Sequence, residues 1–219
     1  MTAYGPHPSQ VVDFHGPADA PVRVTLLHGG YWRERYDRTY LVPLARALAG
    51  PGARVALAEY RRVGGGGGWP ATFDDVAQVV RSASGGRHVL LGHSAGGHLA
   101  LWAAARLPGI DHVVAVAPVA DLARARELAL SDGAVDELLG GRYRPEADPM
   151  RLPAPECPVT LVHGTADTDV PVELSRRYAR AVPHAVLREL DGVDHFAPVT
   201  PGTEACETVL KTVRGACST

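Results

Sequence analysis

Ser94 lies in a segment with clear chemical meaning, because residues 92–96 read Gly-His-Ser-Ala-Gly. The apolar residues 89–91 precede this segment, and an Ala/Leu-rich helical pattern over 98–105 follows it. Gly-x-Ser-x-Gly between a strand and a helix is typical of a nucleophile elbow, a turn that strains the serine backbone and needs glycine neighbours. Such a turn presents the hydroxyl at a helix N-terminus. Ser94 is therefore a candidate nucleophile, and a plain helix N-cap is the alternative interpretation.

Two residues downstream supply the groups that a nucleophilic serine needs. The hydroxyl requires a base to take its proton, and the base requires a carboxylate that fixes its tautomer. Asp167 follows one late strand pattern, and His195 follows the last one. The chain order serine, acid, histidine is that expected of an elbow serine with its partners. We therefore expect Ser94, Asp167 and His195 to form a catalytic triad.

Other residues compete for the acid and base roles. Asp169, Asp191 and Asp194 are alternatives to Asp167, although Asp194 adjoins His195, and neighbours in sequence rarely place a carboxylate against the imidazole Nδ1. The chain has ten histidines. Three of them, apart from His195, lie near strand ends, where they can line the site or orient loops: His28, His93 and His163.

The segment 28–32, His-Gly-Gly-Tyr-Trp, follows an earlier strand pattern and predicts an oxyanion hole. Attack on a carbonyl creates an oxyanion, which preorganised N–H donors must stabilise. The residue after the nucleophile, Ala95, supplies one donor, and glycines let backbone amides face the substrate. We expect the amides of Gly30 and Tyr31 to supply the others, with a simple Gly-Gly turn as the alternative.

The composition is that of an ordinary globular protein, and 219 residues fit one domain spanning 1–219. A net charge of -2 gives no reason to expect nucleic acid or an anionic membrane as partner. The three cysteines form no disulfide framework and are typical of a reducing cytosol. Residues 1–16 have neither the basic nor the apolar region of a signal peptide, and no apolar stretch approaches the roughly 20 residues of a membrane span. We expect a cytoplasmic protein.

Motifs for cofactor or metal chemistry are absent from the sequence. The glycine run Gly64–Gly68 neither opens a helix as Gly-x-Gly-x-x-Gly nor precedes Lys-Ser/Thr, so it predicts a flexible surface loop and not a phosphate site. His93 and His98 do not have the spacing of a zinc-binding His pair, and no cysteines have metal-ligand spacing. We expect no cofactor and no metal.

The order of elements predicts an α/β fold with a mostly parallel sheet covered by helices on both faces. In such sheets ligands bind beyond the carboxyl ends of the strands, where the candidate residues fall. Thr72 and Asp75 predict a capping box at the start of the helix 71–84. The expected strands are 10–15, 22–28, 54–60, 89–91, 112–117, 158–163 and 185–190, and the expected helices are 38–49, 71–84, 98–105, 122–139, 172–181 and 203–214.

Over roughly residues 20 to 215 the chain resembles the α/β-hydrolase superfamily, in the esterase branch that includes kynurenine formamidases. The resemblance lies in the motifs at 28–32, 59–61, 69–71, 74–76, 92–98 and 163–171. His-Gly-Gly-x-Trp is the formamidase form of the oxyanion loop, where lipase-like relatives have His-Gly-Gly-Gly. The resemblance implies the triad above and an α/β-hydrolase fold. The chain is shorter than most lipase-like relatives, so we expect little or no cap domain.

The resemblance also implies a serine hydrolase of short-chain esters or aryl formamides, working through an acyl-enzyme. Tailoring hydrolysis or acyl transfer in secondary metabolism, and a non-catalytic binding protein, are the alternatives. The expected partner is a small ester or amide, and a homodimer is left open. Aromatic and imidazole side chains are candidate substrate contacts, with plain core packing of the aromatic ones as the competing interpretation: Trp32, Trp69, His93 and Phe196.

Overall fold

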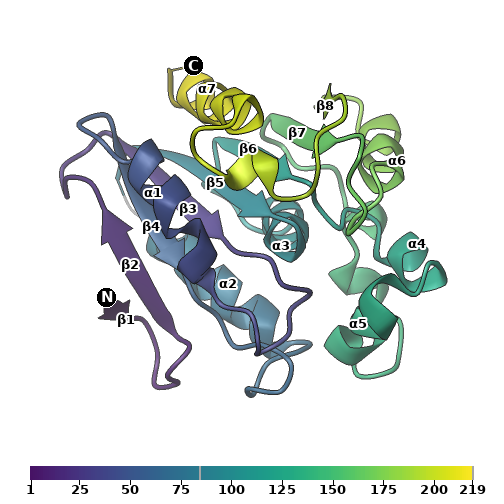
Figure 1. Ribbon diagram of the computed structural model, residues 1–219. Helices are drawn as coiled ribbons and strands as arrows, with labels where there is room; N and C mark the ends of the chain where they lie inside the picture. Colours follow the sequence, from purple (N-terminus) through teal and green to yellow (C-terminus); the bar gives the residue numbers. More distant parts are fainter. Residues whose placement is uncertain (84, 219) are drawn as a thin grey trace.

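The computed structural model describes residues 1–83 and 85–218, and its centre is a twisted sheet (Figure 1). Among the described residues eight strands form this sheet, in the order β1-β2-β4-β3-β5-β6-β7-β8. The pairs β1–β2 and β2–β4 are antiparallel, and every later pair is parallel. The strands are β1 (Thr2–Ala3), β2 (Val11–His15), β3 (Val22–Leu27), β4 (Ala53–Ala58), β5 (Arg87–His93), β6 (His112–Val116), β7 (Val159–Gly164) and β8 (Ala185–Leu190).

Helices cover both faces of the sheet. The α-helices are α1 (Val42–Leu48), α2 (Ala71–Ser82), α3 (Ala95–Ala104), α4 (Leu122–Glu127), α5 (Leu130–Leu139), α6 (Glu173–Ala181) and α7 (Glu204–Ser218), and the 3-10 helices are η1 (Arg38–Leu41), η2 (Pro145–Ala147), η3 (Pro149–Arg151) and η4 (Ala197–Val199). Side chains of α1 and α7 pack in the core layer on one face. Side chains of α2 to α6 pack in the layer on the other.

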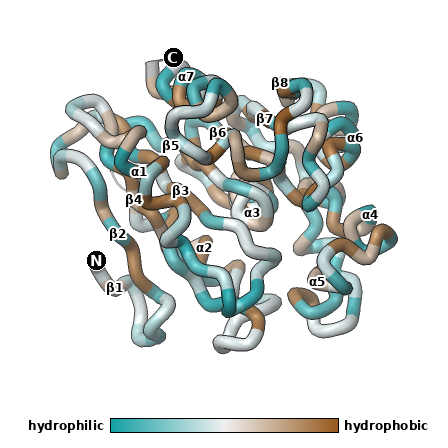
Figure 2. The backbone as a smooth tube through the Cα atoms, viewed as in Figure 1, coloured by the Kyte–Doolittle hydropathy of each residue, from teal (hydrophilic) through white to brown (hydrophobic). Residues whose placement is uncertain are grey.

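The strand sequences explain why two core layers form. Successive side chains of a strand point to opposite faces, so a strand covered on both sides is apolar throughout. In β3, Leu26 packs in the layer under α1 and α7, while Leu27 packs in the opposite layer. Figure 2 shows the resulting hydrophobic stretches along the central strands. The predicted fold class is confirmed, and the segment between β6 and β7 contributes only short helices and no large cap.

The predicted capping box at the start of α2 is wrong. Thr72 lies inside the helix, where its hydroxyl donates to the carbonyl of Arg61 at 2.6 Å and accepts from the amide of Gly68 at 2.9 Å. The Asp75 carboxylate instead accepts from the Arg61 guanidinium and from the side-chain amide of Gln10. Both polar side chains therefore tie the helix to distant segments, which local spacing does not reveal.

The glycine run is not the open, flexible loop that its composition predicts. The amides of Gly65 and Gly67 both donate to the carbonyl of Arg62, at 2.9 and 2.8 Å. A side chain at Gly67 would meet the backbone of Arg61 and Arg62 at 2.3 Å. The glycines are needed because this loop folds back tightly on the segment that follows β4.

Among the helices of residues 1–83 and 85–218, none combines the length and the hydropathy that a membrane span requires.

Candidate active site

Ser94 lies at the sharp turn between β5 and α3, and its backbone is strained. Its φ of 56° and ψ of -120° fall outside the regions that L-residues favour, and such conformations occur mainly at functional sites. The turn requires glycines on both sides. A side chain at Gly92 would lie 2.2 Å from the carbonyl oxygen of Gly96, and one at Gly96 would lie 2.2 Å from that of Leu27. The local geometry is therefore that of the predicted nucleophile elbow.

Three backbone amides near Ser94 are placed to act as donors. Ala95 is the first residue of α3, so its N–H has no acceptor within the helix. Gly30 and Tyr31 border the same cavity as Ser94, and both have positive φ, 101° and 49°. Within the part of the chain that the structure describes, neither of their amides donates a hydrogen bond. Gly30 and Tyr31 thus line the cavity together with Ser94, and Ala95 directly follows Ser94 in the chain.

His195 and Asp167 form a buried hydrogen-bonded pair. His195 follows β8, Asp167 follows β7, and Nδ1 of His195 lies 2.6 Å from Oδ2 of Asp167. The Asp167 side chain is 0% exposed and that of His195 is 5% exposed. A carboxylate at Nδ1 keeps the proton on that nitrogen, which leaves Nε2 free to act as a base. The distant pair selected from the sequence therefore has the contact that a base and its orienting acid need.

The environment of Asp167 keeps it ionised. Burial by itself would raise the pKa of this carboxyl, but hydrogen bonds from His163 and His195 hold the pKa well below its usual range. The second carboxylate oxygen accepts from the amides of Asp169 at 2.9 Å and Val170 at 2.8 Å. These contacts fix both the charge and the orientation of the carboxylate.

Ser94 and His195 border one cavity of about 690 Å³. No hydrogen bond joins their side chains among the described residues, and in unliganded hydrolases such contacts are often longer than in the substrate complex. Four of the side chains that line the cavity are aromatic: Tyr31, Tyr36, Tyr40 and Phe196. Its charged lining residues are Arg35, Asp37 and Asp169. The arrangement suits attack on a small carbonyl compound that carries an apolar or aromatic group.

The four predicted substrate contacts divide into two pairs. His93 and Phe196 line the cavity, and Phe196 is 52% exposed. Trp32 and Trp69 are not among the residues that line this cavity. Trp32 is fully buried and packs edge-to-face on His98, with ring centroids 5.1 Å apart. This packing anchors the segment 28–32 to the core, and Trp69 packs edge-to-face on Phe73 with ring centroids 4.7 Å apart.

Two residues near the site have roles that the sequence did not reveal. His163 was noted as a strand-end histidine, and its Nε2 lies 3.2 Å from Oδ2 of Asp167 while hydrogen-bonding to the carbonyl of Val170 at 2.9 Å. Its spacing of four residues from Asp167 is the signal that could have indicated this contact. Tyr40 also lines the cavity, and it belongs to none of the motifs identified in the sequence.

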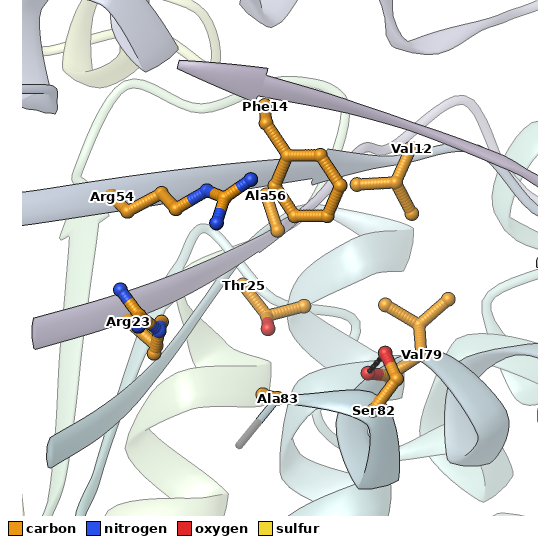
Figure 3. A pocket seen from close by; sticks show the side chains of 9 residues that line it. All are labelled: Val12, Phe14, Arg23, Thr25, Arg54, Ala56, Val79, Ser82 and Ala83. Carbon is orange, nitrogen blue, oxygen red and sulfur yellow. Dashed lines mark hydrogen bonds between the residues drawn. The ribbon is translucent and has the colours of Figure 1, made fainter. Parts of the chain in front are cut away.

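A second cavity of about 180 Å³ lies between β2, β3, β4 and the C-terminal part of α2 (Figure 3). Arg23 and Arg54 line it as register partners on neighbouring strands. The wall opposite them includes Val79 and Ser82 of α2, and the carbonyl end of a helix stabilises nearby cations. Arg23 donates to the carbonyl of Ala20 at 2.7 Å, and the Arg54 guanidinium lies 4.2 Å from the centroid of the Phe14 ring. No part of the candidate triad lines this cavity. Within the described residues, no group of His, Cys, Asp and Glu side chains is arranged to hold a metal ion.

Comparisons with known proteins agree with this fold. A family model described as the alpha/beta hydrolase fold matches residues 22–147. Esterase B from Lactobacillus rhamnosis is similar with a TM-score of 0.81 and 23% identity, over 98% of this chain and 83% of that chain. A truncated carbohydrate esterase from gut microbiota has a TM-score of 0.78 and 17% identity, over 100% and 95%. A propionate-bound thermophilic esterase from Thermogutta terrifontis has a TM-score of 0.77 and 23% identity, over 98% and 91%. A search of curated proteins gave no match.

Proposed function

This chain belongs to the α/β-hydrolase family, and from that premise we propose that it is a serine hydrolase acting through a covalent acyl-enzyme. Its proposed substrates are short-chain carboxylic esters and aryl formamides. The observation that carries the proposal is the buried 2.6 Å contact between His195 and Asp167, with His195 and the strained Ser94 bordering one cavity. The three similar structures are all named esterases, which supports the same reaction class.

In the proposed acylation step, Nε2 of His195 takes the proton of Ser94 Oγ as that oxygen attacks the substrate carbonyl carbon. The carbonyl π electrons move onto oxygen, and the amides of Gly30, Tyr31 and Ala95 stabilise the resulting oxyanion. The oxyanion then collapses and expels the leaving alcohol or arylamine, which takes the proton from His195. Asp167 remains ionised throughout and stabilises the imidazolium.

In the proposed deacylation step, a water molecule replaces the leaving group. His195 removes a proton from the water as its oxygen attacks the acyl carbon, and the same amides stabilise the second oxyanion. The C–O bond to Ser94 then breaks, and His195 returns the proton to Ser94 Oγ. The products are a carboxylic acid and the free enzyme, so each step balances without a cofactor.

The aryl formamide part of the proposal rests on two features. The oxyanion loop has the sequence His-Gly-Gly-x-Trp at 28–32, which is the form found in kynurenine formamidases. The cavity also exposes aromatic rings, Phe196 among them, that could stack on an arylamine leaving group. The tryptophan of the motif makes no contact with a substrate in this proposal, because its ring is fully buried.

Hydrolysis of two substrates by the wild type and by Ser94→Ala tests the proposal. p-Nitrophenyl acetate reports esterase activity, and N-formylkynurenine reports formamidase activity. We expect the wild type to hydrolyse at least one of them and Ser94→Ala to show only the background rate with an unchanged fold by circular dichroism. Equal rates for the two proteins would contradict the mechanism. Failure of a fluorophosphonate to label Ser94 would favour a non-catalytic binding protein.

A further inference from the structure

A chain of three hydrogen bonds links the oxyanion loop to the loop of His195. The amide of Gly29 donates to the hydroxyl oxygen of Tyr40 at 2.8 Å. The Tyr40 hydroxyl lies 2.8 Å from Nδ1 of His93. Nε2 of His93 lies 3.0 Å from the backbone carbonyl oxygen of His195. Tyr40 comes from η1 and His93 from the end of β5, so the chain spans segments far apart in sequence.

When His93 is neutral, its partners allow only one arrangement of protons along this chain. A carbonyl oxygen can only accept, so Nε2 of His93 must carry the hydrogen that it donates to His195. The oxygen of Tyr40 accepts from Gly29, and its single hydrogen is then free to be donated to Nδ1 of His93. In this arrangement both nitrogens of the neutral imidazole are occupied, and every donor in the chain faces an acceptor.

The burial of the two side chains favours the same protonation states. Burial, with a smaller effect of neighbouring His195, lowers the pKa of His93 to about 3. Burial also raises the pKa of the Tyr40 hydroxyl well above its usual value. The protonation states of His93 and Tyr40 therefore do not change near neutral pH. The bridge has no site for a proton from Ser94, although the ring of His93 lies beside that of His195, with centroids 4.6 Å apart.

The bridge also touches the nucleophile from two sides. His93 immediately precedes Ser94 in the chain. Gly29 packs directly on Ser94, because a side chain at Gly29 would lie 2.8 Å from the Ser94 Cβ atom. Displacing Tyr40 or His93 would therefore change the spacing between oxyanion donors, nucleophile and base together. A misplacement of about 1 Å in such a constellation can lower the rate a hundredfold.

We infer that Tyr40 and His93 are positioning residues, which hold the oxyanion loop and the loop of His195 at one fixed spacing around Ser94. The inference rests on the proposed function for its catalytic consequence, but the bridge itself is a property of the folded chain. Neither residue transfers a proton in the reaction. They keep the donors and the base in the geometry that the transition state needs, so their loss reduces kcat more than it weakens substrate binding.

Tyr40→Phe tests the inference, because it removes the one hydroxyl that joins both halves of the bridge. Tyr178→Phe is the matched control: it removes a hydroxyl from a buried tyrosine in α6, outside the cavity. We expect Tyr40→Phe to lower kcat for p-nitrophenyl acetate about tenfold with KM changed less than twofold. We expect the control to retain wild-type kcat. Equal kcat values for the two variants would overturn the positioning role.

Two substitutions of His93 separate the two halves of the bridge. In His93→Gln the side-chain amide nitrogen can replace Nε2 and still donate to His195. In His93→Asn the amide oxygen can replace Nδ1 and still accept from Tyr40. We expect each variant to lose part of kcat and His93→Leu, which keeps neither bond, to lose more than either. Equal losses in all three would overturn the inference, because the hydrogen bonds would then contribute nothing beyond the shape of the side chain.

Long-range ¹H–¹⁵N spectra of the histidine rings test the bridge without requiring turnover. We expect His93 in the wild type to show the neutral Nε2–H tautomer unchanged from pH 8 to pH 5, and its Nδ1 signal to shift in Tyr40→Phe. Protonation of His93 in this range, or the Nδ1–H tautomer, would overturn the inference. If the wild type hydrolyses no substrate, the proposed function fails while these spectra still decide whether the bridge exists.

Discussion

Replacing Asp167 with asparagine should inactivate the protein while preserving its fold. The structure fixes the orientation that the new amide must take. One carboxylate oxygen accepts from the amides of Asp169 and Val170, at 2.9 and 2.8 Å, and only the amide oxygen of asparagine can replace it. The NH₂ group must then face Nδ1 of His195, where Oδ2 of Asp167 lies at 2.6 Å in the wild type.

This orientation places a donor opposite Nδ1 and reverses the tautomer of His195. Nδ1 must then accept, so the ring proton moves to Nε2, which can no longer take the proton of Ser94. The same reversal in a serine triad lowers kcat by about 10⁴. A factor of that size corresponds to about 5 kcal/mol of transition-state stabilisation. We expect this loss in Asp167→Asn, with KM nearly unchanged.

The assay is steady-state hydrolysis of p-nitrophenyl acetate, with thermal unfolding followed by circular dichroism. Asp191→Asn is the matched control, because Asp191 is an exposed carboxylate in the neighbouring loop that accepts a surface bond from the Thr165 hydroxyl at 3.1 Å. We expect the control to remain within about twofold of the wild type, the usual range for a surface change. A kcat of Asp167→Asn within tenfold of the wild type would refute the tautomer argument.

Three further predictions concern stability and the cavity wall. Gly96→Ala should lose about 3 kcal/mol or fail to fold, because the new methyl group would lie 2.2 Å from the carbonyl of Leu27; urea unfolding measures this. Burial lowers the pKa of His98 to about 4, so the unfolded chain takes up a proton there below about pH 6.5 and the folded one does not. Stability should therefore fall between pH 6.5 and 4, and His98→Gln should reduce the slope by up to about 1.4 kcal/mol per pH unit in urea titrations. Arg33→Met removes the bonds from the guanidinium to the hydroxyl and carbonyl of Ser131, at 3.0 and 2.7 Å, which hold this residue in the cavity wall, so KM should rise about threefold with kcat retained; an unchanged KM would contradict this role.

The order of strands and helices was predictable because it depends on local patterns. Apolar runs of strand length alternate with helical spacing, and burial on both faces of a parallel sheet requires such runs. The sharp turn at Ser94 was equally predictable, since close contacts of the turn require Gly92 and Gly96. Asp167 and His195 followed from their positions after successive strands, because the carboxyl ends of parallel strands meet at one edge.

The features that the sequence did not reveal depend on long-range contacts. Thr72 and Asp75 have the spacing of a capping box, but both side chains instead form hydrogen bonds with Arg61, which lies beside them in space. Trp32 was a candidate substrate contact with core packing as the alternative, and its ring is buried in the core. The hydroxyl of Tyr40 acquires its partners only when η1 folds beside the end of β5. Each outcome was decided by tertiary packing, which neither propensity nor motif spacing encodes.

In the proposed mechanism Ser94 carries the acyl group during turnover. Rapid acid quenching of the wild type with p-nitrophenyl butyrate, followed by mass spectrometry of the intact protein and its peptides, detects this intermediate. We expect a butyryl adduct on the peptide containing Ser94, with the most adduct when the reaction is quenched before deacylation. Rapid ester hydrolysis with no adduct at any quench time, and with undiminished rates in Ser94→Ala, would contradict it.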